Sequence, residues 1–107
     1  METFNDVISS DKLVLVDFFA TWCQQCKMMC RVANALGAHP VLENIKQQLG
    51  DSIRIIKVDV DKYQQTAAQY RVQSVPTLML FRNGQNPWRQ SEAISASSLL
   101  SIIKQYQ

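Results

Sequence analysis

The stretch Val14-Leu-Val-Asp-Phe-Phe-Ala-Thr-Trp-Cys-Gln-Gln-Cys-Lys27 decides the fold. It begins in a run from Leu13 to Phe19 that is nearly continuous apolar sequence, which is typical of a strand covered on both faces. Two thiols, Cys23 and Cys26, follow where the strand gives way to a helix. The start of a helix has about four backbone N–H groups without internal partners, which favour a thiolate over a thiol. This placement indicates redox chemistry, with Cys23 as the nucleophile.

Length and composition bound the class of protein. The 107 residues, 47% of them apolar, suit one compact domain over residues 1–107. The net charge is only +2 and the basic residues are scattered, so we expect neither a nucleic-acid partner nor a membrane partner. The start Met1-Glu-Thr-Phe-Asn-Asp lacks a charged and then apolar leader, and no apolar stretch approaches the roughly 20 residues of a membrane span. We therefore expect a cytoplasmic protein.

Hydrophobic periodicity predicts the elements of the first half of the chain. Helices are expected over residues 4–8 with Thr3 as the cap, from Cys26 to Leu36 until Gly37 and Pro40 interrupt, and over residues 41–49. A second buried strand is expected over residues 53–58. A helical crossover leads to this strand, so it should be parallel to the first.

The second half should hold two helices and a hairpin. Residues 61–64 resemble a capping box for a helix that turns Tyr63, Ala67 and Tyr70 inward. Residues 77–82 and a segment near Trp88 flank Asn83-Gly84, which is a strong hairpin signal. Ser95 or a neighbouring serine should cap a last helix, whose core-facing side chains are Leu99, Ile102, Ile103 and Tyr106.

Two motifs together resemble the thioredoxin family. The first is the stretch quoted above, and the second is Val75-Pro-Thr-Leu-Met-Leu-Phe-Arg-Asn-Gly84. The resemblance runs from about Phe4 to Tyr106 and is broken by one insertion, residues 31–39. It implies an α/β fold with a central mixed sheet flanked by helices. Because the chain starts too late to include the family's first strand, we expect four strands.

The resemblance also implies an activity. In this family the first cysteine attacks a disulfide of a client protein, and the second resolves the mixed disulfide. Cys23 and Cys26 match these roles, which implies a thioredoxin-type protein-disulfide oxidoreductase without a cofactor. Its expected partners are disulfide-containing client proteins and a thioredoxin-reductase-like electron donor, and a monomer is expected. Cys23 should lie at the exposed helix start, with Cys26 better shielded.

Asp17 is an ionisable residue inside an otherwise apolar strand. Burial of a carboxylate costs free energy unless it is paired or protonated, so we expect burial to raise the pKa of Asp17. The resemblance places Asp17 beneath Cys26 as the proton acceptor and donor for that thiol, with Lys57 on the neighbouring strand as a charge partner. The alternative is a purely structural ion pair between Asp17 and Lys57.

The resemblance further outlines a groove for the client. Pro76 matches the family's cis-proline, which leaves the backbone of Val75 free to pair with an extended client segment. Trp22 is expected to form an apolar wall of this groove. Glu92 stands where the family normally has glycine, and its negative charge predicts a preference for clients rich in lysine or arginine.

Two further features bear on the chemistry of the dithiol. Gln24-Gln25 replaces the family's usual Gly-Pro and removes a rigid residue, which predicts a less reducing couple. A third thiol, Cys30, falls on the same helical face as Cys23 and Cys26. An iron-sulfur or metal-binding scaffold using these three residues is therefore one alternative, and a non-catalytic thioredoxin-like binding module is another. With only three cysteine thiols in the chain, we favour a core position for Cys30 and no metal site.

Overall fold

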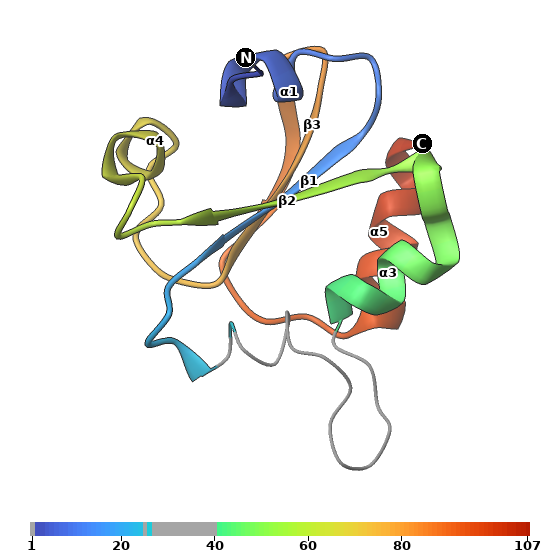
Figure 1. The fold of residues 1–107 in the computed structure, drawn as a ribbon. Coiled ribbons are helices and arrows are strands. Elements are labelled where there is room, and N and C mark those ends of the chain that lie inside the picture. Colours follow the sequence, from blue (N-terminus) through green and yellow to red (C-terminus); the bar gives the residue numbers. More distant parts are fainter. Residues whose placement is uncertain (1, 25, 27–40) are drawn as a thin grey trace.

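The computed structural model describes residues 2–24, 26 and 41–107. The elements are α1 (Phe4–Ile8), β1 (Val14–Phe19), α3 (Val41–Leu49), the 3-10 turn η1 (Gly50–Ser52), β2 (Arg54–Asp59), α4 (Gln64–Gln69), β3 (Thr77–Arg82), β4 (Gln85–Gln90) and α5 (Ala96–Tyr106). Figure 1 shows α3 and α5 side by side on one side of the strands, with α1 and α4 away from them. Within the described residues, no helix combines the length and the apolar character needed to cross a membrane.

The strands form one mixed sheet in the order β2-β1-β3-β4. Strands β1 and β2 are parallel, whereas β3 is antiparallel to both β1 and β4. The parallel pair is the one joined through α3, since two parallel strands need a crossover connection. The predicted α/β fold with a four-stranded mixed sheet flanked by helices is confirmed.

The sheet is covered on both faces at its two central strands, β1 and β3, because side chains alternate along each strand. The edge strands are less covered: β4 has no buried residue, and β2, predicted as a buried strand, buries only Val58. One face packs against α3 and α5 through a cluster of buried residues, Leu13, Leu15, Leu42, Ile45, Ile53, Leu78, Leu80, Leu99 and Ile103. The other packs against α1 through a second cluster, Val7, Ile8, Val14, Val16, Phe18, Val58, Met79 and Phe81. Adjacent residues of β1 thus serve opposite cores, which explains its continuous apolar sequence.

Three local predictions are confirmed. Asn83 and Gly84 have φ values of +54° and +79°, as a two-residue type I′ hairpin requires, and the Gly84 N–H donates to the carbonyl of Ile8 at 2.8 Å. Thr3 caps α1, with Asp6 completing a capping box. The Ser95 hydroxyl caps α5 by accepting from the Ser98 N–H.

The predicted capping box at residues 61–64 is wrong. Instead, Oδ1 of Asp59 accepts hydrogen bonds from the N–H groups of Asp61 and Lys62, at 2.9 and 3.3 Å. This turn delays the start of α4 to Gln64, so Tyr63 precedes the helix and is 51% exposed rather than inward. Ala67 is buried as expected. Most of the helix predicted from Cys26 to Leu36, and the insertion 31–39, lie outside the described residues.

Candidate active site

The two cysteines lie where β1 turns into a helical segment. The Cys23 N–H donates to the carbonyl of Ala20 at 3.1 Å, which closes the turn after the strand, and Gln24 and Cys26 are helical. The Cys26 N–H donates to Sγ of Cys23, with the two atoms 3.1 Å apart. A free amide of the helix start therefore reaches the sulfur of Cys23, where it stabilises negative charge.

Both thiols are buried, which corrects one prediction. Cys23 is 6% exposed and Cys26 is 2% exposed, so Cys23 does not lie at an exposed helix start. It belongs to a small buried cluster with Ala20 and Cys26, against which the partly buried side chains of Val60 and Val75 pack. The order of accessibility is as predicted, with Cys26 the more shielded of the two. Both cysteines are free thiols in this structure.

The surroundings of Cys26 hold its thiol in the protonated form. Burial is the largest cause, followed by the hydrogen bond with Cys23, and together with the negative charge of Asp17 they raise the pKa of Cys26 to about 12. A backbone hydrogen bond from Ala20 acts in the opposite direction and is outweighed. At neutral pH the Cys26 thiol therefore keeps its proton until a base removes it.

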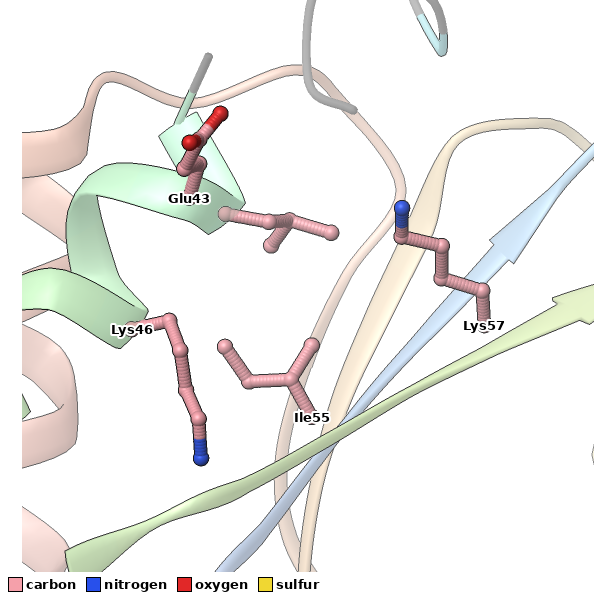
Figure 2. Close-up of a pocket in the computed structure, with 5 residues that line it drawn as sticks. Glu43, Lys46, Ile55 and Lys57 are labelled. Carbon is pink, nitrogen blue, oxygen red and sulfur yellow. The ribbon is translucent and has the colours of Figure 1, made fainter. Parts of the chain in front are cut away.

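Asp17 is fully buried in β1, opposite Lys57 on β2 and Leu78 on β3. Its charge acts on the Cys26 thiol, so the structure brings this carboxyl close to the second cysteine. The Lys57 side chain is exposed and lines a pocket of about 340 Å³ with Leu42, Glu43, Lys46 and Ile55. Figure 2 shows Lys57 extending along this pocket from β2. The register thus places Asp17 and Lys57 on neighbouring strands at the same level.

The segment before β3 closes the site from the other side. The Val75–Pro76 peptide bond is cis, as the resemblance implies. The carbonyl oxygen of Val75 lies 3.7 Å from Sγ of Cys23 and accepts a weak hydrogen bond from the thiol of that residue. Pro76 is buried and Val75 partly buried. The backbone that precedes the cis-proline therefore lies directly against the first cysteine.

Trp22 presents a large apolar surface beside Cys23. It is 68% exposed, and its indole Nε1–H donates to Oδ2 of Asp61 at 3.0 Å. The sequence does not predict this contact of Asp61, because the two residues are separated by 39 positions and the pattern at residues 61–64 favours a helix cap. Its position after β2, where the neighbouring parallel strand also ends, is the signal that could have suggested it.

Glu92 is exposed and follows Ser91, whose hydroxyl oxygen lies 3.2 Å from that of Thr77. Thr77 directly follows the cis-proline Pro76. Glu92 is therefore the neighbour in sequence of Ser91, which contacts the residue next to that proline. Gln25 and Cys30 lie outside the described residues. Within the part of the chain that the structure describes, no three His, Cys, Asp or Glu side chains gather as a metal site would need.

This arrangement of a strand, a dithiol and a cis-proline agrees with the comparison with known protein families. The thioredoxin family model matches residues 1–105. The chain belongs to the thioredoxin family. Membership assigns it a general thiol–disulfide oxidoreductase role.

Relatives of this thioredoxin-family chain support the same assignment. A thioredoxin-like protein of Synechocystis sp. is 41% identical over 95 residues, covering 89% of this chain and 82% of the relative. The thioredoxin of Synechocystis sp. is 36% identical, covering 94% and 86%. Against the chloroplastic thioredoxin Y of Oryza sativa, at 35% identity, the chain spans only 56% of the relative's length.

Solved structures show the same fold. A mutant thioredoxin from Halobacterium salinarum superposes with a TM-score of 0.79 at 33% identity, covering 95% of this chain and 80% of the other. Plasmodium falciparum thioredoxin also gives a TM-score of 0.79, at 31% identity, covering 97% of this thioredoxin-family chain and 91% of the other.

Proposed function

We propose that this chain is a protein-disulfide reductase in which Cys23 is the nucleophile and Cys26 the resolving thiol. The observation that carries the proposal is the hydrogen bond from the Cys26 N–H to Sγ of Cys23, at 3.1 Å. It supplies a fixed donor to the sulfur on which negative charge must reside before attack.

In the first step the Cys23 thiolate attacks one sulfur of a client disulfide. A new S–S bond forms between Cys23 and that sulfur, and the client S–S bond breaks to release the other client sulfur as a thiolate, which takes up a proton. The carbonyl of Val75, 3.7 Å from Sγ of Cys23, marks where an extended client backbone could pair beside the reacting sulfur.

In the second step the Cys26 thiol loses its proton and attacks Sγ of Cys23. The mixed disulfide breaks, the second client sulfur leaves as a thiolate, and a Cys23–Cys26 disulfide remains, so the client has gained two electrons. The resolving thiol lies within one helical turn, which gives it a high effective concentration. The turnover is completed when an external dithiol, from a thioredoxin-reductase-like donor, reduces this disulfide.

Asp17 is the proposed proton acceptor for Cys26. Its carboxyl group is fully buried, and its negative charge contributes to the raised pKa of the Cys26 thiol. A base is needed because the pKa of Cys26 is raised to about 12, so that spontaneous ionisation at neutral pH is rare. Lys57 is proposed as the charge partner of Asp17, from its register position on β2.

The proposed client surface consists of Trp22, Val75, Pro76 and Glu92. Trp22 offers an exposed apolar wall, and Val75 offers backbone atoms. The exposed carboxylate of Glu92 favours lysine or arginine in the client. A Glu92→Gly variant should lose this preference when paired basic and acidic peptide disulfides compete; unchanged selectivity would count against the assignment.

Reduction of insulin by dithiothreitol tests the proposed function. The wild-type protein should accelerate precipitation of the insulin chains above the rate with dithiothreitol alone, whereas Cys23→Ser should give no acceleration. Cys30→Ser is the matched control: it changes the third thiol and should retain activity. A wild-type protein without acceleration would point to the binding module, and loss of activity with Cys30→Ser would revive the three-cysteine alternative.

A further inference from the structure

The segment between α4 and β3 carries the backbone that faces Cys23. It runs from Tyr70, the C-cap of α4, to the cis bond between Val75 and Pro76. Arg71 within it has a φ of +56°, a conformation that a side chain with a Cβ adopts rarely and that needs support from its surroundings. A contact that supports the backbone at Arg71 should therefore stabilise the start of this segment.

Arg89 on β4 supplies that contact. Its guanidinium donates from Nη1 to the carbonyl of Tyr70 at 2.7 Å and from Nη2 to the carbonyl of Arg71 at 3.3 Å. These carbonyls lie at the end of α4, where helical carbonyls lack internal partners and favour a cation. One planar group thus holds two successive carbonyls, those of the strained residue and of the residue before it.

Ser91, two residues along from Arg89, holds the other end. The Thr77 hydroxyl donates to the carbonyl of Ser74 at 2.7 Å and lies 3.2 Å from the Ser91 hydroxyl oxygen. A hydroxyl has one proton, so when Thr77 gives its proton to Ser74, Ser91 donates to Thr77. Thr77 is fully buried, which makes this chain of hydroxyls costly to leave incomplete.

We propose that Arg89 and Ser91 are positioning residues that hold the segment from Tyr70 to Pro76 at its two ends, so that its Val75 backbone is fixed for client binding. This inference rests on the proposed function, since it concerns the groove in which a protein disulfide is bound. Neither side chain touches the reacting sulfurs. They act by keeping the Val75 carbonyl at its distance of 3.7 Å from Sγ of Cys23.

Loss of Arg89 should weaken binding of protein clients more than it affects chemistry at Cys23. An extended client must pair with a fixed backbone at Val75, whereas a small aromatic disulfide needs only access to the sulfur. Arg89→Ala should therefore raise KM for insulin about tenfold, the effect expected when a charge-assisted hydrogen bond is lost, with a much smaller change in kcat. Arg89→Lys should restore binding only in part, because an ammonium cannot form the planar fork.

Arg82→Ala is the matched control. Arg82 also donates from Nη1 to a backbone carbonyl, that of Tyr106 at 3.0 Å, but it lies at the far end of β3 from Thr77, about 17 Å along the strand. The Arg82→Ala variant should have a KM for insulin within twofold of the wild-type value. Equal effects of Arg82→Ala and Arg89→Ala on KM would overturn the proposal, since they would indicate only a general loss of stability.

Amide hydrogen exchange gives a second readout that does not depend on turnover. Exchange in residues 72–77 should quicken at least fivefold in Arg89→Ala and in Ser91→Ala, and not in Arg82→Ala. Unchanged exchange there would overturn the proposal even if insulin were reduced normally. Faster exchange with no insulin reduction by the wild type would uphold the positioning of the segment and reject the proposed reductase function instead.

Discussion

The backbone nitrogen of Cys26 lies 3.1 Å from Sγ of Cys23 and donates its proton to that sulfur. The side chain of the same residue keeps its own proton, because burial raises the pKa of the Cys26 thiol. Cys26 therefore stabilises negative charge on the sulfur of Cys23 through its backbone N–H, while the thiol of Cys26 stays neutral. This difference supports the proposal that Cys23 attacks the client disulfide and Cys26 resolves the mixed disulfide.

The raised pKa of Cys26 predicts a loss of stability in alkali. The unfolded chain loses the thiol proton near the ordinary value of about 8.5, whereas the folded chain keeps it up to about 12. Unfolding therefore releases a proton in this window, and the free energy of unfolding of the reduced protein should fall as the pH rises through it. The slope from this group is at most about 1.4 kcal/mol per pH unit.

Urea unfolding at several pH values between about 8 and 11 measures this slope. The pKa of Tyr70 is also raised by burial and contributes in the same direction, so the comparison is with Cys26→Ala, in which Tyr70 is unchanged. The variant should show the shallower dependence on pH. Equal slopes for the two proteins would mean that the thiol of Cys26 ionises normally.

The hydrogen bond between Trp22 and Asp61 predicts different effects for two substitutions of Asp61. Asp61→Ala removes the acceptor of the indole N–H, so the exposed Trp22 ring should become more mobile and KM for a protein client should rise a few fold. Because both groups are near the surface, the free energy of unfolding should change by less than about 1 kcal/mol. Asp61→Asn keeps an oxygen acceptor and should remain close to wild type. Tryptophan fluorescence anisotropy and insulin kinetics report the two effects, and identical behaviour of the two variants would argue against the hydrogen bond.

The hairpin between β3 and β4 predicts a stability change without a change of chemistry. Gly84 has a φ of +79°, and among the residues that the structure describes a Cβ placed there would come within 4 Å only of Oγ of Ser9, at 3.8 Å. Space is therefore available, and the cost of Gly84→Ala comes from the backbone conformation, about 1–2 kcal/mol in the free energy of unfolding. Gly84→Asn should lose less, since asparagine tolerates this conformation. A Gly84→Ala protein as stable as wild type in urea would show that the turn relaxes.

The two residues between the cysteines, Gln24 and Gln25, predict how the reduction potential of the dithiol should change on substitution. Replacing Gln24 and Gln25 by Gly and Pro restores the rigid residue that thioredoxins usually carry at the helix start. The double variant Gln24→Gly/Gln25→Pro should have the more negative reduction potential, by on the order of 30 mV, when equilibrated with glutathione. A wild-type potential at or below that of the double variant would refute the expectation.

Local sequence predicted most of the fold. The strands over Val14–Phe19 and Thr77–Arg82, the hairpin at Asn83-Gly84 and the caps at Thr3 and Ser95 all depend on neighbours within a few positions. The start of α4 was predicted wrongly, because the Asp59 side chain competes for the amide protons of the next residues. A capping-box pattern cannot reveal that competition.

Part of the candidate active site could also be predicted, but from sequence motifs rather than from local periodicity. The dithiol and the Val75–Pro76 segment follow from two sequence motifs, while the roles of Asp17 and Lys57 came from resemblance alone. The cluster that contains Cys23 packs against Val60 and Val75, which lie far away in the sequence. The contacts of Asp61 and Arg89 likewise depend on distant indole and carbonyl groups. Such contacts leave no periodic signal in the sequence, so only the folded chain reveals them.

The most direct test is to trap the mixed disulfide. Cys26→Ser protein incubated with a disulfide-containing client should form one stable covalent complex, and peptide mass mapping should place its bond at Cys23. Cys23→Ser should trap none. A complex joined through Cys30, or no complex with Cys26→Ser, would contradict the assignment of Cys23 as the nucleophile and Cys26 as the resolving thiol.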